Sequence, residues 1–225
     1  MTRFHAAFAA AAFLVSTSAL ADEWMIDPVH SEAEFHVKHM MVSTVDGSLG
    51  TVSGTVMLDE KHPGNDTVDA SIDVTKLDTR VDKRNQHLMS PDFFDVQKFP
   101  TVTFKSTKVK RKGKGKLEVD GDLTMHGVTK PVTLTVTGPS PLYKNPWGQP
   151  VRAFWATTKI NREDYGLTWN KALEAGGVLV GKDVDVTLSI EVNPPPPPAQ
   201  EDAAATPPPA APAAQPAAAT APAAK

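Results

Sequence analysis

The histidines are the residues of this 225-residue chain whose types and spacing first suggest chemistry, because the chain has no cysteine. Without cysteine, thiol redox chemistry and disulfide bonds are excluded. His30, His36 and His39 are close in sequence, and neutral imidazoles are common zinc ligands. In a strand, however, His36 points to the same side as Glu34 and Lys38, so the three imidazoles need not converge. No metal site is predicted.

A second pair, His87 and Ser90, has the residue types of a base and a nucleophile. A serine hydrolase also needs a third group that orients the histidine, and many carry the serine in a Gly-x-Ser-x-Gly turn. The sequence has neither that turn nor an evident orienting carboxylate. We therefore predict no catalytic residues and a protein that is not an enzyme.

Positive charge is concentrated in residues 108–116, where five lysines and one arginine surround two glycines. This pattern predicts a hairpin tip, which is either a solvated turn that discourages edge pairing or a docking point for anionic lipid headgroups. The formal net charge of the whole chain is only −3, which argues against a nucleic-acid surface.

The elements that would position these residues are strands, because apolar and polar residues alternate along most of the chain. In residues 117–136, one parity is apolar on each side of a turn at His126-Gly127. The same period of two recurs in residues 33–37, 52–58, 68–74, 102–104, 154–160 and 184–192. About eight strands, each with one apolar face, favour an antiparallel barrel or sandwich, and only a closed barrel removes the sheet edges.

Two segments interrupt this alternation and are predicted to be helical. Residues 39–45 are expected to form a short turn. Residues 81–89 have helical spacing, with Asp78 or Thr79 as the expected N-cap and Pro91 beyond the end.

The size of the inward-facing residues bears on whether the barrel is filled. Several are small, namely Ala33, Gly54, Ala70, Ser106, Gly121, Ala156 and Thr158. We therefore predict an incompletely filled apolar lumen lined by Phe35, Val37, Ala70, Ile72, Phe104, Gly121, Leu123, Leu134, Phe154 and Ala156. The alternative is a filled barrel, in which glycines mark strand bends and alanines face bulky neighbours.

A separate group of polar and aromatic residues is expected at the mouth of such a barrel, where they would bind the polar head group of a ligand. The group consists of Arg84, His87, Phe93, Phe94, Arg162 and Trp169. Two alternatives exist for these residues. Arg162 could instead form an ion pair with Asp164, and the aromatic residues could belong to the core.

The two ends of the chain differ from the alternating region. Residues 1–21 combine a positive start, an apolar run and the small residues Ala19 and Ala21, which predicts a cleaved signal peptide and export to the periplasm. Residues 194–225 are nearly all proline and alanine, which predicts a disordered tail. Residues 22–193 then form a single domain.

Motifs spread over this domain resemble those of the YceI-like family of exported lipid-binding proteins. They occupy residues 27–31, 84–95, 99–100, 103–107, 121–130 and 160–167, although the family pattern more often has Asp at the position of Asn85. The resemblance implies a lipocalin-like antiparallel barrel that binds a polyisoprenoid or related long-chain lipid, such as an isoprenoid quinone or its precursor. It brings no catalytic residues and no cofactor other than the bound lipid.

Three functions are therefore weighed. The first is a periplasmic lipid carrier or storage protein, with an anionic membrane surface or a second copy of the chain as further partners. The second is a filled barrel that acts as an envelope stress or interaction protein. The third is a hydrolase or isomerase acting on a lipid, which requires a nucleophile or an acid–base pair inside the pocket.

The signal-peptide prediction can be tested directly. N-terminal sequencing of the protein from the cell envelope should begin at Asp22-Glu23-Trp24, because Ala19 and Ala21 form a small-x-small cleavage site. Recovery of only the uncleaved chain, in the cytoplasm, would contradict it.

Overall fold

The computed structural model describes residues 21–196, and the chain divides into a unit of Met1–Pro195 and a unit of Pro196–Lys225. Residues 1–20 of the predicted signal peptide and residues 197–225 of the predicted tail lie outside the described residues. The strands, in chain order, are β1 (Asp22–Ile26), β2 (Glu32–His39), β3 (Ser43–Ser48), β4 (Thr51–Leu58), β5 (Thr67–Asp73), β6 (Thr101–Gly113), β7 (Lys116–Met125), β8 (Val128–Thr137), β9 (Tyr143–Lys144), β10 (Pro150–Asn161) and β11 (Val180–Asn193). The helical elements are α1 (Asp82–Met89) and the short 3-10 turns η1 (Pro63–Asn65), η2 (Val74–Lys76) and η3 (Arg162–Tyr165).

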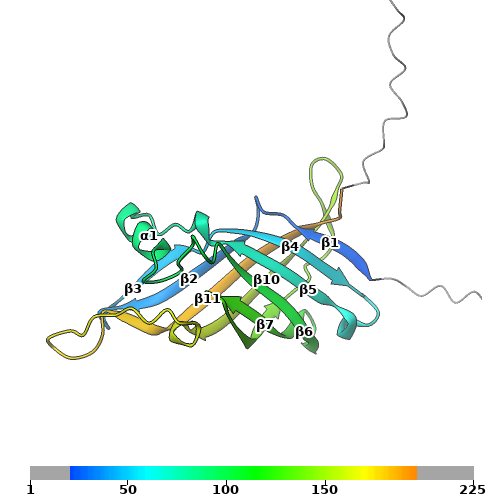
Figure 1. Cartoon of the computed structure of the whole chain (residues 1–225). Helices are drawn as coiled ribbons and strands as arrows, with labels where there is room; N and C mark the ends of the chain where they lie inside the picture. The colour runs from blue at the N-terminus through cyan, green and yellow to red at the C-terminus, as the bar shows by residue number, and fades with distance from the viewer. Residues whose placement is uncertain (1–20, 197–225) are drawn as a thin grey trace, which may run out of the picture. The chain divides into compact units, whose positions relative to one another are not determined.

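Eight of the strands close into an antiparallel ring, which confirms the predicted barrel (Figure 1). The order is β11, β1, β4, β5, β6, β7, β8 and β10, and β10 pairs with β11 to complete the ring. That last pairing is continuous from Arg152 opposite Val192 to Asn161 opposite Asp183. Each strand of the ring has a paired neighbour on both sides, although β1 meets β11 over two residue pairs and β8 meets β10 over three. This pairing satisfies most backbone donors and acceptors between strands, so the interior can be apolar.

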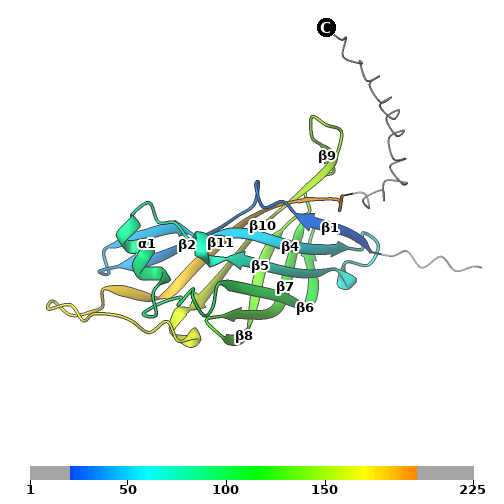
Figure 2. The same cartoon turned by 45° about the horizontal axis from the view of Figure 1, so that its top comes forward.

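β2, β3 and β9 lie outside the ring and extend it at two places, at β11 and at β10 (Figure 2). β11 has 14 residues, so β1 pairs with its last two residues and β2 pairs with an earlier part, from Val180 to Ser189. β2 and β3 form a hairpin, and β3 meets one further residue through a bridge between Ser48 and Asp78. β9 pairs with the start of β10.

The predicted alternation matches the burial of the side chains in most strands. In β10, for example, Ala156 is buried, whereas Trp155 and Thr157 on either side are exposed. β6 departs from simple alternation because its pairing with β7 shifts between Ser106 and Lys108. Such a bulge inserts one residue and reverses the parity, so Val109 is the next buried residue of this strand.

Helix α1 and the loop after it pack at one end of the ring. The predicted helix is confirmed, but the predicted cap is wrong, because the N-cap residue is Val81 and no side chain caps the helix. Instead, Asp78 and Thr79 bind Asn85 inside the helix. The Asn85 Oδ1 accepts the Thr79 amide at 2.8 Å, and its Nδ2 donates to Asp78 Oδ1 at 2.8 Å.

The prediction that residues 39–45 form a helical turn is correct only for the centre of this segment. Residues 40–42 form a turn, but residues 43–45 belong to β3 and pair with β2. Pairing with a neighbouring strand thus decides the conformation where the local sequence does not alternate.

No helix among residues 21–196 is long and apolar enough to cross a membrane.

The close approach of β4 and β5 gives a stability prediction. Gly54 has φ of +139°, and a Cβ there would collide with the carbonyl oxygen of Asp69. Gly54→Ala should therefore lower the free energy of unfolding by about 2 kcal/mol or more in a urea titration. The matched control is Gly64→Ala, since an added Cβ at Gly64 meets no atom within 4 Å. Equal stability of the two variants would contradict the account.

Candidate functional site

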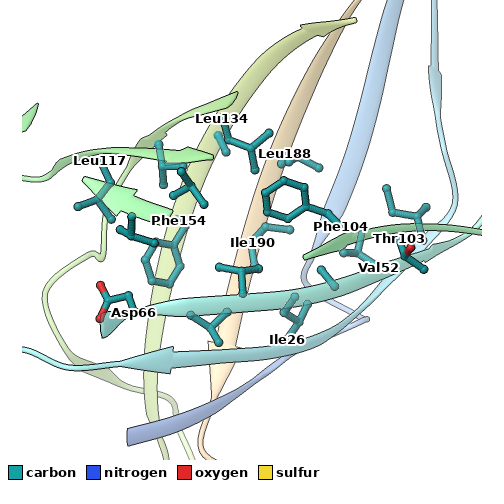
Figure 3. A pocket seen from close by; sticks show the side chains of 18 of the residues that line it. Ile26, Val52, Asp66, Thr103, Phe104, Leu117, Leu134, Phe154, Leu188 and Ile190 are labelled. Carbon is teal, nitrogen blue, oxygen red and sulfur yellow. The ribbon is translucent and has the colours of Figure 1, made fainter. Parts of the chain in front are cut away.

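The interior of the ring contains an apolar cavity of about 120 Å³ (Figure 3). Side chains from β6, β10 and β11, including Phe104, Phe154 and Leu188, point into the same space. Asp66 and Thr103 are the residues with polar side chains among those that line it. The full lining consists of Ile26, Val52, Val56, Leu58, Asp66, Val68, Ala70, Ile72, Val102, Thr103, Phe104, Val109, Leu117, Val119, Leu134, Val136, Phe154, Ala156, Leu188 and Ile190.

Six of the ten predicted lumen residues line this cavity. They are Ala70, Ile72, Phe104, Leu134, Phe154 and Ala156. Gly121 does not line it, because the Phe104 ring packs over it, and a Cβ at Gly121 would collide with that ring. Because Gly121 of β7 has no side chain, the Phe104 ring can pack over this strand. In this position the ring forms part of the cavity wall.

Leu123 and the pair Phe35 and Val37 occupy other places than predicted. Leu123 packs between two core clusters and is not among the residues that line the cavity. Ile72 and Leu49 likewise pack against two clusters, so these side chains separate the lumen from the end of the barrel near α1. Phe35 and Val37 lie on the far side of that partition, in two further cavities.

The first of these further cavities has about 80 Å³ and is lined by α1, β2, β11 and the loop that contains Phe93 and Phe94. The second has about 180 Å³ and lies beside it, towards the turn between β2 and β3. Both are lined by Phe35, Val37, Leu88, Phe93 and Val180. Because they share these wall residues, the two cavities lie side by side; we call them together the passage, and the cavity nearer the turn between β2 and β3 the mouth.

Most of the predicted mouth residues do come together at this mouth. Arg84, His87, Phe93 and Trp169 line it, and Lys38 and His39 of β2 complete its polar part. The His87 ring lies edge-on to Trp169 at 4.7 Å between ring centroids and to Phe93 at 5.1 Å. Phe94 is buried in the core and lines the inner of the two cavities.

The Arg84 and His87 side chains are held by neighbouring residues. Arg84 donates from Nε to the Thr79 hydroxyl at 2.8 Å and from Nη2 to the Thr79 carbonyl at 2.7 Å. His87 Nε2 lies 3.0 Å from Asp92 Oδ2, while the Ser90 hydroxyl donates to the main-chain carbonyl of His87. Ser90 and the His87 ring therefore do not form a nucleophile–base pair.

Arg162 has a different environment from the one predicted. Its side chain is buried, with 4 % exposure, and it donates to the carbonyl oxygens of Leu167 and, at 2.9 Å, of Gly181. The carboxylate near it belongs to Glu163, at 3.8 Å, so the alternative ion pair with Asp164 is also wrong. These bonds tie η3 to the start of β11, so Arg162 mainly holds the wall of the passage.

The histidines considered for metal binding have separate partners. His36 Nδ1 lies 2.8 Å from Asp46, whereas His30 lies with Asp27 and Glu191. The Asp27 carboxylate also accepts hydrogen bonds from the Val29 amide and from Asn193. The cluster around His30 therefore serves as a link between the end of β1 and the end of β11.

The basic hairpin forms as predicted, between β6 and β7, but part of its charge is paired. Lys110 contacts Asp120 at 2.7 Å and Glu118 at 3.1 Å, and Lys112 contacts Glu118 at 3.0 Å. Lys114 and Lys116 at the tip have no ion pair within 4.0 Å among residues 21–196.

Fourteen of the twenty residues that line the cavity are outside the predicted lumen set, and Asp66 is the ionisable residue among them. It lies between η1 and β5, and its Oδ1 accepts the Asp59 amide at 2.7 Å. Burial raises the pKa of the Asp66 carboxyl, and the negative charge of Asp59 adds to this shift. The only signal in the sequence is that Asp66 directly precedes an alternating strand, which does not distinguish it from an ordinary turn aspartate.

Comparisons with known proteins identify the family. The YceI-like domain family matches residues 24–192. The chain is 38% identical over 162 residues to the UPF0312 protein VPA0850 of Vibrio parahaemolyticus, covering 70% of this chain and 84% of that protein. It is 39% identical over 166 residues to Protein YceI of Salmonella newport, covering 72% of this chain and 85% of that protein.

Solved structures show the same fold. BcnA of Burkholderia cenocepacia aligns with a TM-score of 0.63 at 22% identity, over 74% of this chain and 98% of that one. The YCEI protein of Campylobacter jejuni gives 0.59 at 25% identity, over 71% and 90%. A polyisoprenoid-binding domain from Saccharophagus degradans gives 0.54 at 16% identity, over 78% and 99%.

The position of Asp66 predicts a pH-dependent stability. A raised pKa means that the folded state resists deprotonation, so the wild-type protein loses stability as the pH rises through that pKa. Asp66→Asn keeps an oxygen for the Asp59 amide and removes the charge. The variant should therefore match the wild type at acid pH and exceed it in free energy of unfolding at neutral pH.

Asp69→Asn is the control, because Asp69 is exposed on the outer face of β5. It should change the free energy of unfolding little at either pH. An Asp66→Asn variant that is less stable than the wild type at neutral pH would show that the carboxylate charge stabilises the fold, contrary to this account.

Proposed function

Because the chain belongs to the YceI-like domain family, we propose that it is an exported protein that carries or stores a long-chain lipid inside its barrel. The proposed ligand is a polyisoprenoid, an isoprenoid quinone or a precursor of one. The structural neighbour described as a polyisoprenoid-binding domain supports this ligand class. The lipid is the only bound molecule in this proposal.

The observation that carries the proposal is the apolar cavity enclosed by the ring. Its walls are aliphatic and aromatic side chains, with Asp66 and Thr103 as the polar exceptions. An alkyl or isoprenoid chain in this space would gain about 25 cal/mol for each Å² of apolar surface removed from water. A polar ligand would leave most of its hydrogen bonds unmade there, at a cost of a few kcal/mol per group.

The passage near α1 suggests how the ligand is oriented. Its outer cavity combines the aromatic surface of Trp169 with the cationic side chains of Lys38 and Arg84. A polar head group can form charge-assisted hydrogen bonds at this mouth while the chain extends towards the lumen. Leu49, Ile72 and Leu123, which stand between the two, would have to change rotamers to admit a long chain.

The competing functions have less support. A filled barrel that acts only as an interaction protein does not require an apolar cavity of about 120 Å³. A lipid hydrolase or isomerase requires a nucleophile or an acid–base pair. The candidate nucleophile, the Ser90 hydroxyl, donates its hydrogen to the main-chain carbonyl of His87 and not to the His87 ring. We therefore propose a binding protein and not an enzyme.

The site of action and the partners belong to the same proposal. The signal-peptide pattern of residues 1–21 supports a periplasmic location. An anionic membrane surface is the proposed donor or acceptor of the lipid. A homodimer is compatible with a ring whose lumen lies within one chain.

Filling the lumen tests the proposal. Ala70→Phe and Ala156→Phe place a ring in the cavity that both alanines line, so the lipid recovered per protein after organic extraction should fall sharply. If the cavity normally holds lipid, the lipid-free variants should remain folded in thermal denaturation. In a filled barrel the same changes would overpack the core and cost about 1–3 kcal/mol.

Ala153→Phe is the matched control, because Ala153 is exposed and lies on β10, the strand that also carries Ala156. It should leave both the lipid content and the melting temperature unchanged. Destabilised Ala70→Phe and Ala156→Phe variants, together with a wild-type protein that carries no lipid, would refute the carrier function.

A further inference from the structure

The turn between β2 and β3 exposes three apolar side chains in a row. Met40, Met41 and Val42 are 45 %, 61 % and 83 % exposed. Hairpin turns on protein surfaces are usually made of glycine, asparagine and aspartate. We call these three residues the methionine tip.

The backbone of the methionine tip makes this composition more unusual. Met40 has φ of +51° and Met41 has φ of +65°, so both lie in the left-handed region. A bulky side chain is disfavoured there, whereas glycine and asparagine adopt this conformation at little cost. The fold alone would therefore favour other residues, and the methionines point to a function of the exposed surface.

The methionine tip is attached to the mouth of the passage. The Met40 amide donates to the Leu179 carbonyl at 2.8 Å, and Leu179 lines the mouth together with His39, the residue before the tip. Met41 lies against Gly177, and Val178 in the same loop is 37 % exposed. The turn between β2 and β3 and the loop of residues 171–179 thus form one apolar rim beside the mouth.

Positive charge accompanies this rim. Lys38 lines the mouth and donates to the Thr44 hydroxyl, and the Lys171 carbonyl accepts the amide of Leu179. Neither lysine has an ion pair within 4.0 Å among residues 21–196. The loop of residues 171–179 contains one acidic residue, Glu174. Exposed apolar side chains flanked by lysines match the interface of an anionic bilayer, where apolar groups insert and cations meet headgroups.

We propose that the methionine tip docks the mouth of the barrel onto an anionic lipid bilayer, so that a lipid passes between membrane and passage without crossing water. This inference rests on the proposed function and adds the surface through which the ligand is exchanged. The basic hairpin cannot serve the mouth directly. It lies at the Gly113 end of β6, and the Thr101 end is the one beside η2 and α1.

The test uses the exported full chain with Met40→Asn and Met41→Gly combined, residues that suit left-handed backbone. Binding is measured by flotation with vesicles of phosphatidylethanolamine and phosphatidylglycerol. We expect the bound fraction of the variant to fall by about tenfold and its melting temperature to rise, because strain is relieved while apolar contact is lost. Uptake of lipid from detergent should equal that of the wild type, whereas uptake from vesicles should slow.

Two control variants alter other exposed surfaces. Tyr143→Asn with Trp147→Ser removes exposed aromatic residues near β9, and Lys114→Gln with Lys116→Gln removes charge from the basic hairpin. Both should bind vesicles as the wild type does. Unchanged vesicle binding by the methionine variant, or its loss only in the lysine variant, would overturn the proposal.

A different outcome would assign the methionine tip to another partner. If sedimentation detects a dimer that the methionine variant loses, while vesicle binding is unchanged, the tip is a contact between two copies and the proposal is wrong. Failure of the carrier function is distinguishable from these outcomes. In that case the wild type would bind vesicles through the tip but take up no lipid, from vesicles or from detergent.

Discussion

The pairing of β10 with β11 is the interaction on which the rest of the structure depends. It joins the two ends of the ring over a continuous register from Arg152 opposite Val192 to Asn161 opposite Asp183. Once the ring is closed, backbone hydrogen bonds are made between strands and the interior side chains need not satisfy them. Closure thus allows an interior that is lined almost wholly by apolar side chains, and left partly unfilled, without the unpaired edges of an open sheet.

Much of the ring was predictable because burial on one face of a strand produces a period of two in the sequence. The inward positions of Phe104, Leu134, Phe154 and Ala156 follow from that period alone. The bulge after Ser106 was not predictable, because the inserted residue is defined only by its pairing with β7. The same holds for residues 43–45, which become a strand through contact with β2.

The site was predictable in composition but not in arrangement. His87 and Phe93 are close in sequence, but Trp169 comes from a distant segment, and the ring contacts among the three depend on how the loops cover the end of the barrel. Arg162 has the residue type of a head-group ligand, yet burial and main-chain carbonyls occupy its guanidinium. Asp66 was missed because a turn aspartate and a lumen aspartate look alike until the neighbouring strands are in place.

Native mass spectrometry of the exported protein, before and after organic extraction, tests the central claim most directly. The account predicts a mass above that of residues 22–225, an excess that matches one long-chain lipid, and its loss on extraction while the protein still refolds to the same secondary structure. A protein of bare mass from freshly prepared envelopes, with no lipid taken up from membranes or detergent, would contradict a lipid-binding barrel.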